Sequence, residues 1–313
     1  MNRFNYMFKR LLVTIPVLFV VTLLIFFMIR LIPGDPARIT LGEMAIEEDI
    51  IKLREEMGLN ESYFVQYTIF MNKLVHFDLG KSLVYKRPVA ELIKSKIIVT
   101  ISLTLVATIF AIIISFPMGY LAGTHKDKLP DQIIRVLSLA SISVPAFWVG
   151  LMLMLIFGVR LKLLPAGGWG RNFFDCLRSL ILPGIAQALV TTALMMRNLR
   201  NSVVDINKLD YVDFARSKGA NENIIRKDYI MRNAMISTIT LLGMRMTWML
   251  GGSIIIETVF SLPGLGKFMI DSIFGRDYAS VQSLVFIFSF LVLIMNLLTD
   301  VIYSIIDPRV TLE

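Results

Sequence analysis

A polar segment, residues 210–233, separates two long apolar stretches in the second half of the chain. It opens with Asp210-Tyr-Val-Asp-Phe-Ala-Arg-Ser-Lys-Gly219, in which Asp213 follows Asp210 by three residues. Carboxylates at this spacing suit the first turn of a helix, where the unpaired N–H groups and the helix dipole favour negative charge. We therefore predict a helix Tyr211–Lys218 with Asp210 as its N-cap. We also predict a sharp turn at Gly219, because glycine accepts the left-handed conformation that ends many helices.

The predicted helix carries side chains suited to binding a protein partner. Residues three and four positions apart share a helix face, and this face gathers Tyr211, Phe214, Ala215 and Lys218. Asn221 is a suitable N-cap for a second, basic helix that continues into the next apolar stretch. The alternative is an ordinary basic helix lying on lipid headgroups. The segment mixes acidic residues with basic ones, which favours protein binding.

The sequence lacks the spacing typical of a catalytic, metal or nucleotide site. His76 and His125 are isolated, and Ser253 lacks a plausible base. The stretch Pro263-Gly-Leu-Gly-Lys267 only superficially resembles a phosphate-binding loop. Ser261 stands where that motif needs a glycine, and neither Ser nor Thr follows the lysine. We therefore expect no cofactor in this chain and no enzymatic activity of its own.

The composition predicts a membrane protein. Of the 313 residues, 56% are hydrophobic and 18% are charged, and the mean hydropathy is +0.69. This is more apolar side chain than one soluble core of this size buries. The net charge of +8 is typical of cationic loops on a cytoplasmic membrane face, and the sequence holds no recognisable nucleic-acid module. A single cysteine, Cys176, excludes a disulfide within the chain.

Apolar runs long enough to cross a bilayer recur along the chain. Crossing about 30 Å of hydrocarbon takes about 20 residues at about 1.5 Å each. We predict six transmembrane helices: Leu11–Ile29, Ile97–Leu121, Val136–Val159, Ser179–Met196, Ala234–Ile256 and Ala279–Thr299. The first is interpreted as a retained helix rather than a signal peptide, because no small-residue cleavage site follows it.

The distribution of Lys and Arg predicts the orientation of these helices. Both are concentrated in the N-terminal tail, in the turn 123–131 and in the segment 197–233. These regions alternate on one side of the membrane, which the positive-inside rule assigns to the cytoplasm. The expected fold is an all-α polytopic membrane protein with cytoplasmic N- and C-termini and a long external loop after the first helix.

Three domains follow from this arrangement. Residues 1–30 form the N-terminal tail and first transmembrane helix, residues 31–96 form an external helical insertion, and residues 97–313 form a five-helix core. Within the insertion, apolar and charged residues alternate at helical spacing, which predicts amphipathic helices at Ile46–Gly58 and Tyr63–Phe77.

Polar residues inside the predicted spans are candidates for a solute pathway. They are Ser141, Ser143, Gln187, Thr191, Thr192, Thr247 and Ser253. The alternative for each is a hydrogen bond to its own helix backbone or to a neighbouring helix. Arg245 and Asp300 are charged and also fall inside spans. A charge near the bilayer centre costs at least about 2.5 kcal/mol, so we predict an ion pair between them. The alternative is that Asp300 reaches the interface.

Motifs along nearly the whole chain carry a family resemblance. They are Arg30-Leu-Ile-Pro-Gly-Asp-Pro-Ala37, Asp78-Leu-Gly-Lys-Ser-Leu83, Arg87-Pro-Val89, Ser143-Val-Pro-Ala-Phe-Trp148, Leu164-Pro-Ala-Gly-Gly168, Gly252-Ser-Ile-Ile-Ile-Glu257, Leu262-Pro-Gly-Leu-Gly266 and Ile306-Asp-Pro-Arg309. Together they resemble the permease subunits of binding-protein-dependent ABC importers, and in detail the first permease of the dipeptide, oligopeptide, nickel and glutathione branch. Phe214-Ala-Arg-Ser-Lys-Gly219 resembles the cytoplasmic coupling loop of that family. Asp213, Phe214 and Ala215 stand where the general pattern has Glu-Ala-Ala.

The resemblance implies a multi-pass subunit of a prokaryotic inner-membrane importer. It would form a pore with a second permease, receive solute from an external binding protein and contact two cytoplasmic ATPases, which would bind ATP and Mg²⁺. Phe214 and Ala215 would pack in a groove of one ATPase, and Gly219 would allow the turn. Arg216 and Lys218 would pair with acidic residues of that ATPase.

The expected substrate is a di- or oligopeptide, with nickel, a metal chelate or glutathione as alternatives within the same architecture. An ion-coupled secondary transporter is a second class of function. It would favour buried acidic residues at discontinuous midplane helices, for which only Asp300 is a partial candidate. A receptor or scaffold is a third class, which would bind partners through the external loop without moving solute.

Overall fold

The computed structural model describes residues 15–27, 35–42, 45–56, 58–82 and 84–306. Within these ranges the chain is helical, and its β-type pairing is limited to one isolated bridge between Lys81 and Pro88. Both termini, and the two ends of the predicted first span, lie outside the described residues. The cytoplasmic position of the termini stays a prediction.

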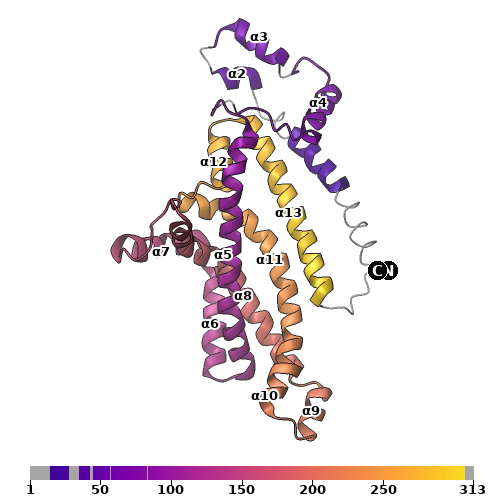
Figure 1. Cartoon of the computed structure of the whole chain (residues 1–313), viewed down its shortest axis with the longest axis vertical. Helices are drawn as coiled ribbons and strands as arrows, with labels where there is room; N and C mark the ends of the chain where they lie inside the picture. Colours follow the sequence, from indigo (N-terminus) through magenta and orange to yellow (C-terminus); the bar gives the residue numbers. More distant parts are fainter. Residues whose placement is uncertain (1–14, 28–34, 43–44, 57, 83, 307–313) are drawn as a thin grey trace. The chain divides into compact units, whose positions relative to one another are not determined.

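Helices follow one another along the chain with short connections (Figure 1). The first are a helix Ile15–Phe27, α2 (Pro36–Leu41), α3 (Glu47–Glu56) and α4 (Tyr63–Val75). The middle of the chain forms α5 (Val89–Thr124), α6 (Leu129–Ser143), α7 (Ala146–Leu153), the π-helix η1 (Met154–Arg160) and α8 (Phe173–Ile206). The remainder forms α9 (Asp210–Ser217), α10 (Glu222–Ile224), the π-helix η2 (Ile225–Met231), α11 (Arg232–Val259), α12 (Leu265–Phe274) and α13 (Tyr278–Ile306).

The chain divides into two compact units. One comprises Met1–Val99 and Gly264–Leu293, and the other comprises Thr100–Pro263 and Ile294–Glu313. Helices α5 and α13 each belong partly to one unit and partly to the other. The polar segment and the helices before and after it belong to the second unit.

The two amphipathic helices predicted in the external insertion are confirmed as α3 and α4 in the first unit. Gly58 follows α3 with a φ of +64°, a conformation that glycine adopts without strain. Ser62 caps α4 by accepting a hydrogen bond from the N–H of Val65 at 3.4 Å. Tyr67 of α4 shares a 2.9 Å hydrogen bond with Thr22 of the helix Ile15–Phe27.

A buried carboxylate joins the loop before α5 to the start of α13, again within the first unit. Asp277 is fully buried and accepts hydrogen bonds from the hydroxyls of Ser82 and Ser280. Ser283 donates a further hydrogen bond to the carbonyl of Leu79 at 2.8 Å. These bonds satisfy a charge that would otherwise be costly to bury, and they fix the loop on α13.

Four helices in the described residues are long and apolar enough to cross a membrane: Val89–Thr124, Phe173–Ile206, Glu222–Val259 and Tyr278–Val301. A bent pair, Leu129–Ser143 with Ala146–Arg160, passes the same test as a fifth. The helix Ile15–Phe27 is apolar but shorter. These helices overlap the six predicted spans, whereas the count of six crossings stays a prediction.

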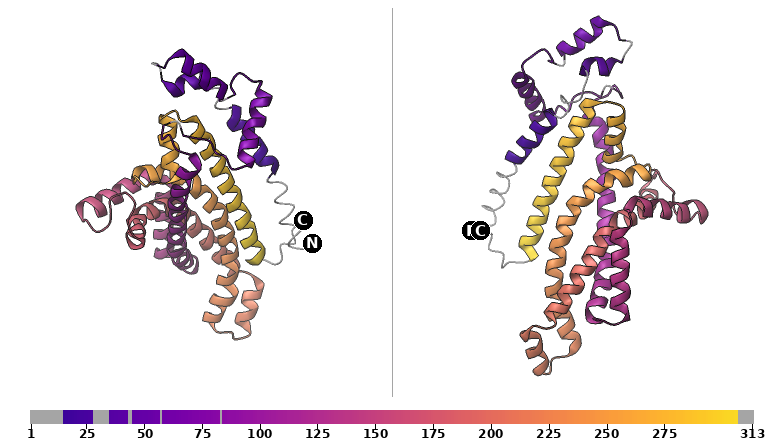
Figure 2. Two further views of the ribbon diagram at one scale, coloured as in Figure 1. Left: turned by 45° about the horizontal axis from the view of Figure 1, so that its top comes forward. Right: turned by 180° about the vertical axis from the view of Figure 1, so that it is seen from behind.

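The bent pair turns by 101°, so the predicted span Val136–Val159 is not one straight helix. Its cause is local. Pro145 has no N–H to continue the helix, and its ring forces the preceding residue out of the helical region. Val144 is accordingly extended, with φ −93° and ψ 129°, and Pro145 begins α7 as its N-cap. Both views in Figure 2 show α7 turning away from the direction of α6.

Small residues let α5 and α8 approach closely in the second unit. A Cβ added to Gly123 would lie 2.6 Å from the Cβ of Val203, and one added to Gly119 would lie 2.9 Å from the carbonyl oxygen of Met196. Glycines four residues apart on one helix are a common way to bring membrane helices together. This contact sets the position of the end of α8, from which the polar segment begins.

Candidate functional site

The predicted helix Tyr211–Lys218 is present as α9, Asp210–Ser217, which begins and ends one residue earlier than predicted. Leu209, which has extended backbone angles, occupies the N-cap position, so the prediction of Asp210 as N-cap is wrong. Asp210 and Asp213 both lie in the first turn, where their charge still complements the helix dipole.

One side of α9 is buried against its own chain. Val212 is 0% exposed and Ala215 is 7% exposed. Both belong to a hydrophobic cluster completed by Leu199, Val203, Ile225, Ile230 and Ala234 of α8, η2 and α11. The expectation that Ala215 packs in a groove of an ATPase is therefore corrected, because its methyl group faces the cluster. The helix is held by apolar contacts with the helices before and after it.

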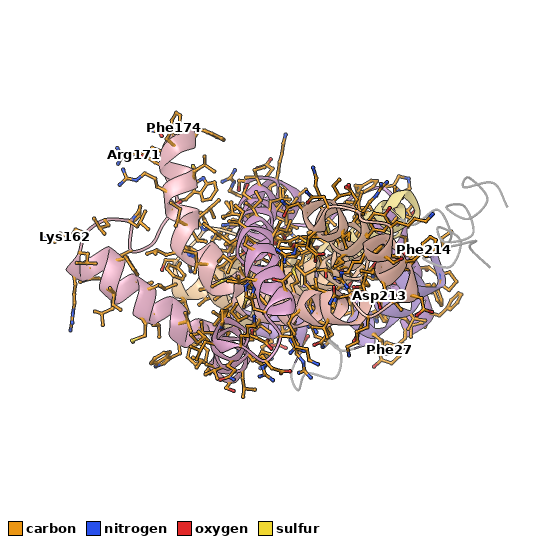
Figure 3. The ribbon with its side chains drawn as sticks, turned by 90° about the horizontal axis from the view of Figure 1, so that it is seen from below. Phe27, Lys162, Arg171, Phe174, Asp213 and Phe214 are labelled. Carbon is orange, nitrogen blue, oxygen red and sulfur yellow. The ribbon has the colours of Figure 1, made fainter. Side chains whose placement is uncertain are left out.

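The other side of α9 is exposed and carries the aromatic residues. The side chain of Phe214 is 59% exposed and that of Tyr211 is 40% exposed. Figure 3 labels Asp213 and Phe214, which lie next to each other on this short helix. Lys218 places its Nζ atom 4.4 Å from the centre of the Phe214 ring, so part of the exposed surface is an aromatic ring with a cation above it. This surface, formed by Tyr211, Phe214 and Lys218, is called the knob below.

Arg216 is engaged within its own segment. Its Nη1 atom donates to Asp213 at 3.1 Å, and its Nη2 atom donates to the side-chain oxygen of Asn207 at 2.7 Å. Two longer bonds, of 3.4 Å, reach Glu222. The hydrogen bond with Glu222 raises the pKa of Arg216 above its usual value. Arg216 thus clamps α9 between the end of α8 and the start of α10. Its side chain is 35% exposed, so its pairing with a partner's carboxylate stays a prediction.

The connection from α9 to α11 has the turn at Gly219 and the helix cap at Asn221 that the sequence predicts. Gly219 has a φ of +78°, and its N–H donates to the carbonyl of Arg216 at 2.9 Å, which ends the helix as predicted. Asn221 caps the next helix by accepting from the N–H of Asn223 at 2.9 Å, also as predicted. From Glu222 to Val259 the backbone is continuously helical, through the π-helix η2 into α11. Figures 1 and 2 both show α9 and α10 beyond the end of α11.

Aromatic stacking and hydrogen bonds join the knob to η2. The rings of Tyr211 and Tyr229 stack with centres 6.4 Å apart. The side-chain nitrogen of Asn233 donates to the carbonyl of Tyr229 at 2.7 Å and to the hydroxyl of Tyr211 at 3.3 Å. Tyr211 therefore touches both α9 and the helix leading into α11.

Several candidate pathway residues use their polar groups inside the helices. The hydroxyls of Ser141, Ser143 and Ser253 donate to backbone carbonyls of their own helices. Gln187 of α8 donates to the carbonyl of Met249 in α11 at 2.9 Å. Thr191 and Thr192 of α8 are buried, and Thr247 of α11 donates to Asn296 of α13 at 2.9 Å. The bonds of Ser141, Ser143, Ser253, Gln187 and Thr247 match the alternative weighed for them, whereas the buried hydroxyl of Thr192 has no hydrogen-bond partner among the described residues. A pathway role stays a prediction for all seven residues.

Arg245 lies in α11 and Asp300 in α13, both in the second unit. Their ion pair stays a prediction. The structure also contains a pair that was not predicted from the sequence. Asp131 at the start of α6 is fully buried and receives two hydrogen bonds from Arg200 of α8, at 3.0 and 2.7 Å. Two charged residues close to the ends of apolar runs are the sequence signal that could have suggested it.

The exposed side chains of this segment include aromatic and charged groups. The described residues contain no group of three or more His, Cys, Asp or Glu side chains that could hold a metal ion. What the polar segment presents is an exposed aromatic and cationic knob on a helix that is clamped at both ends and packed on the membrane helices.

Comparisons with known proteins cover nearly the whole chain. Residues 115–312 match the family described as binding-protein-dependent transport system inner membrane component, and residues 1–104 match the N-terminal component of the same system. The glutathione transport system permease protein GsiC of Escherichia coli O6:H1 is 37% identical over 306 residues, covering 98% of each chain. The protein of the same name from Salmonella choleraesuis is also 37% identical over the same share.

Solved structures show the same fold at low sequence identity. Inward-facing MetNI methionine ABC transporter aligns with a TM-score of 0.58 at 15% identity, over 70% of this chain and 98% of that chain. An amino acid ABC transporter with histidines aligns with a TM-score of 0.52 at 18% identity, over 71% of this chain and 95% of that chain. The chain therefore belongs to the family of binding-protein-dependent transport system inner membrane components, the multi-pass permease subunits of ABC importers.

Proposed function

We propose that this chain forms the solute pathway of an inner-membrane importer together with a second permease, and that α9 docks into one of two cytoplasmic ATPases. The observation that carries the proposal is the knob. Phe214 is 59% exposed, although the helix that bears it is packed and clamped. An exposed aromatic ring on a rigid support is typical of the residues that dominate the binding energy at protein interfaces.

The continuity from the polar segment into α11 gives the knob a means of acting on the membrane helices. Movement of an ATPase would displace α9, and the shared cluster around Val212 and Ile225 would carry the displacement to α8 and α11. ATP binding shifts an equilibrium between two conformations only through contacts that differ between them. The contact at the knob would supply that difference.

Small peptides are the proposed cargo. The relatives named above transport glutathione by their printed names, and glutathione is itself a tripeptide. A general di- or oligopeptide substrate and glutathione are therefore versions of one substrate class. Nickel or a metal chelate is the second candidate within this architecture, since a binding protein can present a metal inside its ligand.

Reconstitution tests the proposal. The chain would be assembled with its second permease, both ATPases and the external binding protein in proteoliposomes, and uptake of labelled dipeptide, glutathione and nickel would be measured. We expect ATP-dependent uptake that needs the binding protein. Uptake that is independent of ATP and collapses with an ionophore would instead indicate a secondary transporter, and ligand binding without uptake would indicate a receptor.

A further inference from the structure

A cavity of about 280 Å³ lies in the second unit among α5, α6 and α8. Its walls divide into two parts. Apolar side chains form the larger part, including Ile134, Leu139, Ile142 and Met196. Three arginines, an asparagine and Ser138 form the other part, and the lining in the described residues includes no acidic side chain. The cavity is distinct from the polar segment and from the candidate pathway residues.

Two of the three guanidinium groups at the cavity belong to exposed side chains, those of Arg135 and Arg197. Arg200 is committed to Asp131 through two hydrogen bonds. Arg135 lies 3.7 Å from the same carboxylate, and its side chain is 53% exposed. Arg197 is exposed and takes part in none of the hydrogen bonds and ion pairs found among the described residues. The carboxylate of Asp131 carries one negative charge and forms its hydrogen bonds with Arg200. A net positive charge therefore remains at this end of the cavity.

The positions of these arginines along the helices place them at the membrane surface. Arg135 directly precedes the apolar run Val136–Val159, and Arg197 directly follows the run Ser179–Met196. Both therefore stand where an apolar run ends, which is the depth of lipid headgroups. Ile142 is seven residues beyond Arg135 on α6, about 10 Å further towards the hydrocarbon at the rise of a helix.

We propose that this cavity binds one anionic phospholipid. The phosphodiester oxygens would accept hydrogen bonds from Arg135 and Arg197, and the side-chain N–H₂ of Asn201 offers a further donor. One acyl chain would lie along Leu139 and Ile142 in the apolar part. Charge complementarity selects an anionic lipid, because the ammonium group of a zwitterionic headgroup would bring its own positive charge to a site that already has an excess.

Native mass spectrometry of the purified complex tests this site without relying on transport. The complex would be delipidated and titrated with phosphatidylglycerol, with phosphatidylcholine and with glycerol phosphate. We expect one tightly bound phosphatidylglycerol per copy of this chain. Phosphatidylcholine should bind more weakly, and glycerol phosphate should fail to bind at the same concentration because it has no acyl chain for the apolar part.

Variants separate this site from general attraction to a basic surface. Arg135→Ala with Arg197→Ala should weaken phosphatidylglycerol binding by about tenfold or more. Lys126→Ala with Lys128→Ala removes the same charge from the neighbouring turn and should leave binding unchanged. Ile142→Trp keeps both arginines, fills the apolar part and should also weaken binding. Melting temperatures of all variants would be compared with the parent to confirm folding.

Two results would overturn the proposal. One is equal phosphatidylglycerol binding in the arginine and lysine double variants. The other is efficient cross-linking of a Ser138→Cys variant to the second permease in the delipidated complex, because a protein partner would then occupy the cavity. The site and the docking role of α9 can fail independently, since lipid retention is read without nucleotide or substrate.

Discussion

The Nζ atom of Lys218 lies 4.4 Å from the centre of the Phe214 ring, on the exposed side of α9. A cation above an exposed aromatic ring contributes about 0.5–1 kcal/mol. This is enough to bias the ring towards one position before a partner arrives. The opposite side of the helix is held by the cluster around Val212 and Ala215. A partner would therefore meet a preorganised surface and lose little entropy in ordering it.

Replacing Phe214 by Ala should weaken docking of the ATPases while leaving the chain folded. A buried aromatic anchor at an interface commonly contributes about 2 kcal/mol or more, which corresponds to about thirtyfold in the dissociation constant. The measurement is ATPase binding to the purified permease pair, together with solute-stimulated ATP hydrolysis.

Phe173→Ala is the matched control for this variant, because Phe173 is 71% exposed and lies at the far end of α8 from the polar segment. It should retain parental ATPase binding. Equal ATPase binding by the Phe214→Ala variant and the parent would show that the knob is not part of the interface with the ATPase.

Replacing Arg216 by Ala should loosen the polar segment without unfolding the membrane helices. The side chain bridges Asn207, Asp213 and Glu222, and each exposed ion pair of this kind contributes only about 0.2–1 kcal/mol. We expect faster amide hydrogen exchange in α9 and reduced coupling of ATP hydrolysis to transport. Arg226→Ala, which loses a single 3.5 Å contact with Glu222, should change exchange in α9 much less. Indistinguishable exchange in the two variants would contradict a clamping role.

Replacing Gly123 by Ala should destabilise the packing of α5 on α8. The added Cβ would lie 2.6 Å from the Cβ of Val203, and overpacking of this kind costs about 1–3 kcal/mol. Gly251→Ala is the control, because among the described residues no heavy atom outside the local backbone of its own helix lies within 4 Å of its added Cβ. That variant should be neutral or slightly stabilising, since alanine favours helix over glycine by about 1 kcal/mol. Apparent melting temperatures in one detergent measure the difference, and a Gly123→Ala variant as stable as its control would show that the helices can separate freely.

Replacing Asp131 by Asn should destabilise the junction of α6 and α8. The carboxylate is fully buried, and removing one member of a buried pair costs about 3 kcal/mol, because the charge of Arg200 is left without its partner. The exposed pair Arg87–Glu91 serves as a control, and Glu91→Gln should cost less than about 1 kcal/mol. Thermal inactivation of both variants and the parent measures these effects. An equal loss of thermal stability in the two variants would mean that the buried pair contributes no more to stability than the exposed pair.

The sequence was most informative where local chemistry determines structure. Acidic residues, a glycine and an asparagine at helix ends predicted α9 and the start of α10 to within one residue. The error at Asp210 arose because Asp is also stable inside a first turn, so its presence does not distinguish the cap from the position after it.

Long-range packing was harder to predict. Spacing placed Phe214 and Ala215 on related positions of one helix, but it could not say which side would face the chain itself. That depends on Leu199 and Ile225, which come from other helices. The pair Asp131–Arg200 joins residues 69 positions apart. Their places near the ends of apolar runs mark both as charges at the membrane surface, but they do not say which charge pairs with which. The bend at Pro145 could have been predicted from the sequence, because proline disfavours helix at the residue before it.

The π-helix η2, Ile225–Met231, lies between the knob and α11. A π-helix hydrogen-bonds each N–H to the fifth residue before it rather than the fourth, and it accommodates one residue more than an α-helix would. Removing that residue would turn α9 by about 100° relative to α11, the angle of one residue in an α-helix. The direction in which Phe214 faces relative to α11 therefore depends on the winding of η2, and a one-residue deletion in η2 would rotate the knob while leaving its composition intact.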